Sequence, residues 1–388
     1  MLSKRRLLTV PAVLVWLVAA TVLVGCGTPI ERMVERSVEW IDERPQSAAA
    51  LSSYPWFGDR FVGVDVWEVV ICRVPVGVAD PTYEPSTLRL ESSATEISGE
   101  LDAVVDYFER WSRGRYRPVF RAGSDVSIDD DESNQDCVDR ALDVSASDVD
   151  GVLVVADAQH RETVPGGWGR PGRPCVMDCP ASLTRRAVYV GAADFMAEES
   201  PPLDLVEHEM GHALDWPHSN LSDDSADRGE YDSPFDLMSD SSAGRNADAT
   251  VRHAPGPLAI HLHAAGWLAV DEVVEVDSSV TVDMVPADSV EPGVRLIVVP
   301  LGDSFWTVEA IADRGDNAHL DRTQVVVHRV NLAPPAETGV ARRQTVVASG
   351  LVEGSTHAGD RSSVTVTAVE GERWTIRVEL PGREESAG

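Results

Sequence analysis

Hydrophobic positions in the first half of the chain predict several strands and one amphipathic helix. Phe61–Val76 is rich in Val and Ile, which is typical of a strand. Ala94–Trp111 carries apolar residues at helical spacing, so we expect a helix there. The acidic stretch Ser124–Asp150 is expected to form a loop. Further short strands are expected at Arg115–Ala122, Gly151–Ala156 and Ala187–Gly191.

From about Val270 the pattern changes to short Val- and Thr-rich runs separated by Gly, Pro and Asp, which predicts an all-β tail. We therefore predict an α+β fold, with a mixed-sheet domain over residues 61–270 and a C-terminal β domain over residues 271–388. The runs in the tail are Ser279–Met284, Gly293–Leu301, Ser304–Ile311, Gln324–Val330 and Ser362–Leu380.

The N-terminus has the features of an export signal. The basic head Lys4-Arg5-Arg6 precedes an apolar stretch over residues 7–24, as in secretory signal peptides. Leu23-Val24-Gly25-Cys26 resembles the bacterial lipobox, whose cysteine is acylated and becomes the first residue of the mature chain. We expect residues 1–25 to be a lipoprotein signal peptide, Cys26 the lipidation site, and residues 26–60 a tether at the bacterial cell surface. An uncleaved transmembrane anchor is the alternative.

Composition and charge agree with a globular, exported protein. Hydrophobic residues make up 43% of the 388 residues, and 64 Asp and Glu against 33 Lys and Arg give a net charge of −31. Since nucleic-acid binders need a basic face, we expect no nucleic-acid partner. Four cysteines follow Cys26, an even number that suggests disulfides. Cys72–Cys137 with Cys175–Cys179 is the simplest of three possible pairings, and a zinc site at Cys175 and Cys179 is a weaker alternative.

One segment carries the residues of a metal site, His208-Glu209-Met210-Gly211-His212 followed by His218. Residues four apart share a face of a helix, so His208 and His212 can bind the same ion. Glu209 lies near enough to hold a water molecule beside it. Pro217 cannot continue the helix and helps His218 to turn back as a third ligand. Three histidines leave the fourth position open, as in catalytic zinc sites.

The helix that carries this motif is expected to bury its opposite face. We expect Ser200 to cap it, with Pro201 at its first position. The apolar residues on the far side from the histidines are Leu203, Val206, Met210, Ala213 and Leu214.

Other candidate motifs are weaker. The residue types of Gly167–Gly172 match the dinucleotide-binding pattern. In that pattern a helix begins at the glycines, and Pro171 would prevent this, so we expect a loop. His261 and His263 are expected to be core or surface residues. The acidic segment Asp223–Asp227 offers oxygen ligands, which makes calcium a second candidate ion beside zinc, although a solvated loop is the simpler interpretation.

With its third histidine, the motif resembles the signature of the metzincin zinc peptidases, His-Glu-x-x-His-x-x-Gly-x-x-His followed by a methionine turn. Asp232–Ser239 looks like that turn, with Met238 as a packing platform beneath the metal. Ala264–Leu268 and Trp306–Ala310 are similar to secreted relatives of the immune-inhibitor-A and gametolysin type. The resemblance implies that residues 61–270 form a metzincin-like catalytic domain.

The activity that the resemblance implies is zinc-dependent hydrolysis of peptide bonds in extracellular proteins. Zinc on His208, His212 and His218 would polarise the scissile carbonyl, while Glu209 would activate the zinc-bound water and pass its proton to the leaving amine. The strand at Ala187–Gly191 is expected to bind the substrate as an added β-strand. The alternative function is a cell-surface binding lipoprotein that keeps a metal site without turnover.

Two positions depart from the family pattern. Asp215 stands where the family has a glycine that adopts a left-handed backbone as the helix ends. Asp tolerates that conformation at a cost of about 1 kcal/mol, so we expect Asp215 to end the helix; as an alternative, it would replace His218 as a ligand. Asp240 stands where the family often has a tyrosine after the methionine, and Tyr231 is a weaker candidate for a helper near the oxyanion.

The lipidation site leads to a first prediction. Replacing Cys26 by Ala removes the acceptor of the lipid, so the variant should leave the membrane fraction for the soluble fraction of the cell envelope. Fractionation followed by immunoblotting measures this. Continued membrane attachment with an uncleaved leader would instead support the transmembrane anchor.

Overall fold

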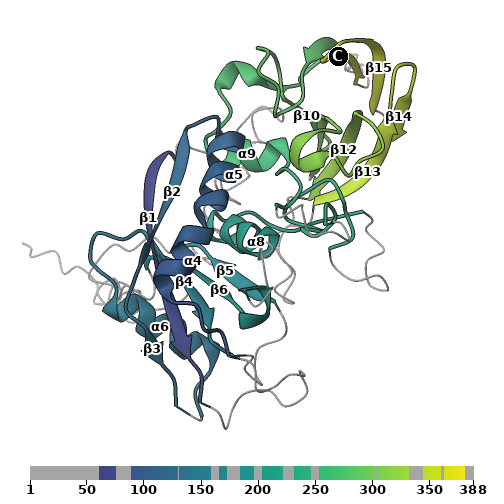
Figure 1. Cartoon of the computed structure of the whole chain (residues 1–388). Coiled ribbons are helices and arrows are strands. Elements are labelled where there is room, and N and C mark those ends of the chain that lie inside the picture. The colour runs from purple at the N-terminus through teal and green to yellow at the C-terminus, as the bar shows by residue number, and fades with distance from the viewer. Residues whose placement is uncertain are drawn as a thin grey trace, which may run out of the picture. The chain divides into compact units, whose positions relative to one another are not determined.

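The computed structural model describes residues 61–75, 89–129, 131–158, 166–172, 184–195, 203–221, 231–245, 253–302, 304–331, 344–359 and 362–380 (Figure 1). All of them belong to one compact unit, Gln46–Gly388. The predicted signal peptide, Cys26 and the tether lie outside the described residues, as do Cys175 and Cys179. Among the described helices, none combines the length and the apolar character needed to cross a membrane.

A mostly parallel sheet forms the first half of the fold. The strands follow the order β2-β1-β4-β6-β5, and β3 pairs with β1. Only β5 runs antiparallel to its neighbour β6, and it lies at the edge of the sheet. The strands are β1 (Gly63–Arg73), β2 (Tyr116–Ala122), β3 (Val126–Ser127), β4 (Gly151–Ala156), β5 (Gly167–Arg170) and β6 (Arg186–Val190).

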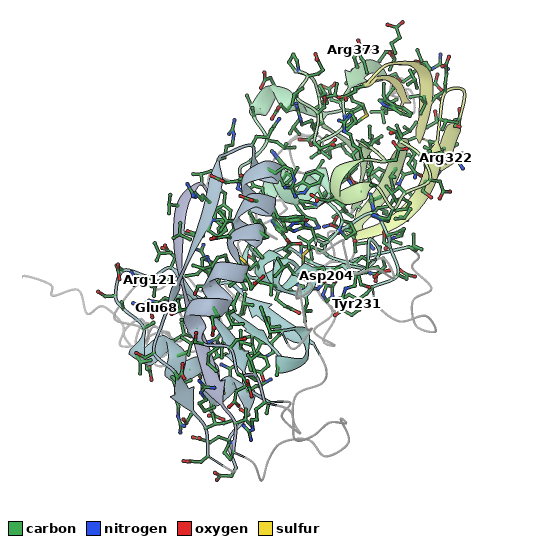
Figure 2. The ribbon with its side chains drawn as sticks, viewed as in Figure 1. Glu68, Arg121, Asp204, Tyr231, Arg322 and Arg373 are labelled. Atoms are coloured by element: carbon green, nitrogen blue, oxygen red, sulfur yellow. A yellow bond between two sulfur atoms is a disulfide. The ribbon has the colours of Figure 1, made fainter. Side chains whose placement is uncertain are left out.

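Helices cover both faces of this sheet. One face packs against α4 (Ala94–Glu100), α5 (Asp102–Ser112) and α8 (Asp204–Ala213), and the other against α6 (Asn134–Val144) (Figure 1). Every residue of β4 is buried, as expected for a Val-rich strand with helices on both sides. On the neighbouring strands β1 and β2, Arg121 forms an ion pair with Glu68 at 3.1 Å (Figure 2).

The structure differs from the expected elements in two of these places. The helix expected over Ala94–Trp111 is two helices, which meet at Leu101. The acidic stretch Ser124–Asp150 is not a loop, because it contains β3 and α6. Ser133 caps α6 in a reciprocal hydrogen-bond pair with Asp136. At least one acidic residue of this stretch therefore helps to begin a helix.

Two further sheets follow in the second half. The first has the order β7-β13-β12-β11-β10-β8 and the second β14-β15-β16-β9. Four of the runs expected in the tail are single strands, and the fifth, Ser362–Leu380, is the antiparallel pair β15 and β16; β8, β13 and β14 were not predicted. The elements are β7 (Ser219–Asn220), α9 (Ala259–Ala264), β8 (Val273–Glu275), β9 (Val280–Met284), β10 (Leu296–Pro300), β11 (Ser304–Ile311), β12 (Gln324–Asn331), β13 (Gln344–Leu351), β14 (Thr356–Gly359), β15 (Ser362–Glu370) and β16 (Arg373–Glu379), with short 3₁₀ turns at Ala192–Phe195, Val270–Glu272 and Gly315–Asn317.

The sheet that contains β11 and β12 is buried on both faces. Trp306 and Val308 of β11 belong to the core shared with the second sheet. Phe305 and Ile311 of the same strand belong to the core that also holds α5 and α8. Because side chains alternate along a strand, β11 joins the two cores.

A disulfide bond joins Cys72 of β1 to Cys137 of α6. It is the first pair of the simplest pairing expected from the sequence, and it fixes α6 to the sheet. Both cysteines are buried in the core beneath α6.

Removing this disulfide should destabilise the protein. The bond closes a loop with a sequence separation of 65 residues, for which the chain-entropy model gives roughly 4 kcal/mol of stabilisation. A Cys72→Ala/Cys137→Ala variant should therefore unfold at clearly lower urea concentration than the parent chain. Equal urea midpoints for the two proteins would contradict the prediction.

Candidate metal centre

Helix α8 positions the first two histidines. It begins at Asp204, with Leu203 as its N-cap and no capping side chain, which is later than the start expected from Ser200 and Pro201; these two residues lie outside the described residues. Instead, the buried Asp204 carboxylate (Figure 2) lies in the first turn, where a negative charge is favourable, and binds Arg245 at 2.8 Å. The expected apolar face is fully buried, at Leu203, Val206, Met210, Ala213 and Leu214.

The end of α8 is a Schellman motif built on Asp215. The φ angle of Asp215 is 69°, the left-handed conformation that the sequence predicted. Its backbone N–H donates to the His212 carbonyl at 2.8 Å, and the N–H of Trp216 donates to the Gly211 carbonyl at 3.0 Å. The turn therefore satisfies the last helical carbonyls and redirects the chain towards His218.

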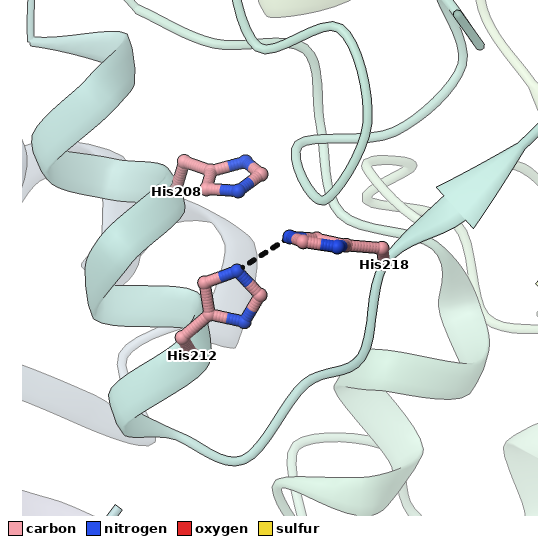
Figure 3. Close-up of side chains that lie close together, drawn as sticks. All are labelled: His208, His212 and His218. Atoms are coloured by element: carbon pink, nitrogen blue, oxygen red, sulfur yellow. Dashed lines mark hydrogen bonds between the residues drawn. The ribbon is translucent and has the colours of Figure 1, made fainter. Parts of the chain in front are cut away.

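The chain brings His208, His212 and His218 together (Figure 3). One potential ligand atom from each residue lies within 4.8 Å of the other two, and the Nε2 atoms of His212 and His218 are 2.7 Å apart. His208 and His212 project from α8, while His218 faces them from the segment just before β7. Among the described residues, no other group of histidine, cysteine or acidic side chains meets the same criterion, and Asp215 is not part of this group.

Backbone carbonyls orient two of the rings. The Nδ1 atom of His208 lies 2.7 Å from the Leu237 carbonyl, and Nδ1 of His212 lies 3.0 Å from the Trp216 carbonyl. A carbonyl only accepts, so each Nδ1 carries the proton and each Nε2 offers its lone pair. Burial lowers the pKa of His208, and burial together with His208 and His218 lowers the pKa of His212 well below its usual value. Both imidazoles are therefore neutral at pH 7, the form that binds metal.

The donor set fits zinc. Three imidazoles are a known ligand set of catalytic Zn²⁺, with Zn–N bonds of about 2.0–2.1 Å. Tetrahedral bonds of that length place two nitrogens roughly 3.3 Å apart. This spacing lies between the 2.7 Å of the closest pair and the 4.8 Å within which all three ligand atoms lie.

Glu209 contributes a buried carboxyl to the same helix. Its side chain is almost fully buried, and Oε2 has no hydrogen-bond partner. Burial raises the pKa of Glu209 to about 8, although a hydrogen bond from the backbone of Gly169 opposes this shift. An unpartnered oxygen at such a position is costly for stability and is therefore a functional candidate.

Strand β5 packs very close to α8, and two glycines allow this. A Cβ atom on Gly169 would lie 1.8 Å from the Glu209 carbonyl oxygen, and one on Gly167 would lie 2.9 Å from Glu209 Cγ. The segment Gly167–Gly172 thus begins with a strand rather than the expected loop. The pattern of glycines alone did not predict this strand, because the glycines allow close packing against α8 and do not form a ligand-binding turn.

The segment around Met238 contacts α8 and the residue that follows His218. Met238 is fully buried, and a Cβ atom on Gly211 of α8 would lie 2.3 Å from its sulfur. The Met238 carbonyl accepts a hydrogen bond from the N–H of Ser219 at 3.1 Å, and the neighbouring Leu237 carbonyl orients His208. These contacts agree with a packing role for Met238.

Tyr231, the weaker candidate for a helper near the oxyanion, lies beside the histidines. Its ring centroid is 4.6 Å from that of His218 and 5.6 Å from that of His208. Its φ angle of 76° is unusual for a residue other than glycine, and 45% of its surface is exposed. Asp240, at the family tyrosine position, instead accepts a hydrogen bond from the Ser242 hydroxyl.

Several groups that support the histidine site could not be identified from the sequence. The Leu237 and Trp216 carbonyls belong to the backbone, which has no sequence signal. Asp236 is also fully buried behind the site, and it is hydrogen-bonded to the equally buried His261. The segment proposed for calcium, Asp223–Asp227, lies outside the described residues.

Comparisons with known proteins give distant matches only. No protein-family model matches the chain, and a search of curated proteins finds no match. Archaemetzincin from Methanopyrus kandleri matches with 14% identity over 54% of this chain and 96% of its own, at a TM-score of 0.29. Metalloproteinase-II from Bacteroides fragilis matches with 12% identity over 62% and 71%, at 0.27, and a chaperone–substrate complex with 17% over 54% and 35%, at 0.24. These scores are too low to carry a functional argument, which therefore rests on the site.

The left-handed Asp215 leads to a prediction. Asp215→Gly removes the steric cost of the positive φ angle, so it should stabilise the protein by up to about 1 kcal/mol and leave zinc binding intact. Chemical denaturation and metal analysis of the purified variant measure both effects. Loss of zinc from Asp215→Gly would show that Asp215, and not His218, completes the site.

Proposed function

We propose that this chain is a zinc-dependent endopeptidase of extracellular proteins, held at the cell surface by a lipid on Cys26. The observation that carries the proposal is the convergence of His208, His212 and His218 next to a buried carboxyl, Glu209, with an unpartnered oxygen. The proposed zinc ligands are the three histidines. This set leaves room for a fourth ligand, as catalytic sites require.

The residues of this chain have different proposed roles in hydrolysis. A bound zinc ion supplies a Lewis acid that polarises a carbonyl and lowers the pKa of water. His208 and His212 keep their lone pairs directed at the centre, because the Leu237 and Trp216 carbonyls hold their Nδ1 protons. This prior orientation means that the rings need little rearrangement when substrate arrives.

Glu209 is the proposed general base, because a zinc cation on the neighbouring histidines would lower its raised pKa and favour the ionised carboxylate. Its position directly after His208 on α8 and its unpartnered Oε2 suit a group that takes a proton from the attacking water and gives it to the leaving amine. The backbone of Gly169 fixes the carboxyl through a hydrogen bond. Tyr231, whose ring packs against His218 and His208, is the proposed helper at the developing oxyanion.

The substrate strand expected at Ala187–Gly191 needs a correction. That strand, β6, has β4 on one side and β5 on the other, so no peptide can add to it. Among the described strands, the edge of the sheet on this side is β5, which also packs against α8. We propose that an extended peptide pairs with β5, which would bind main-chain groups and select little for sequence.

The Glu209→Gln variant tests the function. It keeps the size of the side chain but removes the base, so zinc should remain bound while cleavage of unfolded casein falls by at least roughly 10²-fold. The parent chain with a chelator is the control, and it should lose activity that added zinc restores. A parent chain that binds zinc yet never cleaves casein would favour the alternative, a binding lipoprotein without turnover.

A further inference from the structure

The backbone next to the third histidine, His218, pairs with a strand from the C-terminal part of the chain. Strand β7, which follows His218 directly, pairs in parallel with β13, where Ser219 lies opposite Gln344 and Asn220 opposite Thr345. Through β13, it becomes an edge strand of the sheet that contains β11 and β12. The backbone that carries His218 is therefore placed by the C-terminal sheet.

Asp236 connects this strand to the rest of the site. Its carboxylate is fully buried and accepts hydrogen bonds from the Ser219 hydroxyl at 2.6 Å and from the Leu258 N–H at 3.3 Å. Oδ2 also lies 3.2 Å from Nε2 of His261, on α9. One side chain thus links the residue after His218 to the start of α9 and to its first turn.

Asp236 is also close in sequence to the group that orients His208. The next residue, Leu237, supplies the carbonyl that holds Nδ1 of His208, and Met238 accepts the hydrogen bond from the Ser219 N–H. A shift of Asp236 would therefore move the support of His208 and that of His218 together. His212 is supported by the Trp216 carbonyl, and its link to Asp236 is less direct, because the Trp216 ring stacks on His261 with the ring centroids 5.2 Å apart.

The C-terminal sheet supports the same cluster a second time, through α9. Glu309 of β11 is buried and accepts a hydrogen bond from the N–H of Ala259, the first residue of α9, at 2.9 Å. His328 of β12 is buried beside it, with Nδ1 3.9 Å from Glu309 Oε1. Thr307 of β11, the pairing partner of His328, is buried as well, and uncompensated burial of polar groups such as Glu309 and His328 is costly. Their placement agrees with a selected link between sheet and site.

We propose that Asp236 is a positioning residue for the three-histidine site, through which the C-terminal sheet holds His218 and the support of His208 in register. The proposal rests on the proposed role of the histidines as zinc ligands. Asp236 does not bind the ion itself, since its carboxylate is occupied by Ser219, Leu258 and His261. Its contribution is to the geometry of the ligands, and the zinc dissociation constant should report it.

The test compares zinc binding by Asp236→Asn and Ser219→Ala with a matched control. Ser112→Ala is that control, because Ser112 is equally buried and its hydroxyl is hydrogen-bonded to the Tyr116 backbone rather than to Asp236. Zinc dissociation constants come from competition with a chromophoric chelator. The absorption spectrum of the Co²⁺-loaded proteins reports ligand geometry, and thermal melting of the metal-free proteins reports stability.

We expect zinc binding to weaken by 10- to 100-fold in Asp236→Asn and in Ser219→Ala, with an altered Co²⁺ spectrum, and to stay unchanged in Ser112→Ala. Because both changes break the same link, the double variant should lose little more than either single variant. If Asp236→Asn fails to fold, Ser219→Ala carries the test. Equal zinc affinity in Ser219→Ala and Ser112→Ala would overturn the proposal. Since the readout is zinc binding, a chain that binds zinc but cleaves nothing would contradict only the proposed peptidase function.

Discussion

A metal-binding imidazole almost always donates its other ring N–H to a hydrogen-bond acceptor, and this need organises the region around α8. The Leu237 carbonyl meets it for His208, and the Trp216 carbonyl meets it for His212. Each carbonyl needs a fixed position. The turn at Asp215 and the packing of Met238 against Gly211 provide it, so both support the orientation of the histidines. The position of the rings thus depends on backbone that lies beyond the helix.

This dependence explains which parts of the site could be predicted from the sequence. Side chains four apart on a helix converge by geometry alone, so His208 and His212 needed no tertiary information. The left-handed Asp215 was also predictable, because the family pattern that the motif resembles has at this position a glycine that ends the helix in the left-handed conformation. The carbonyls and Asp236 depend on contacts between distant segments, which no local pattern encodes.

The same distinction holds for the fold. Strand β4 lies where its continuous apolar run placed it, because a strand buried on both faces leaves a strong local signal. Helix α6 was missed, since its acidic residues hid the buried positions Val138, Ala141 and Leu142. Strand β5 was missed because Gly167 and Gly169 are unfavourable for strands in isolation, and only the nearness of α8 explains them.

The pairing of β7 with β13 has a consequence for how the protein matures. Ser219 and Gln344 are far apart along the chain, and contacts between distant segments form late because a large loop must close first. A nascent chain that has exposed His208 and His212 therefore still lacks the fixed position of His218 until its last strands have been made. If the proposed signal peptide directs export of the unfolded chain, the metal site would then become complete only outside the cell.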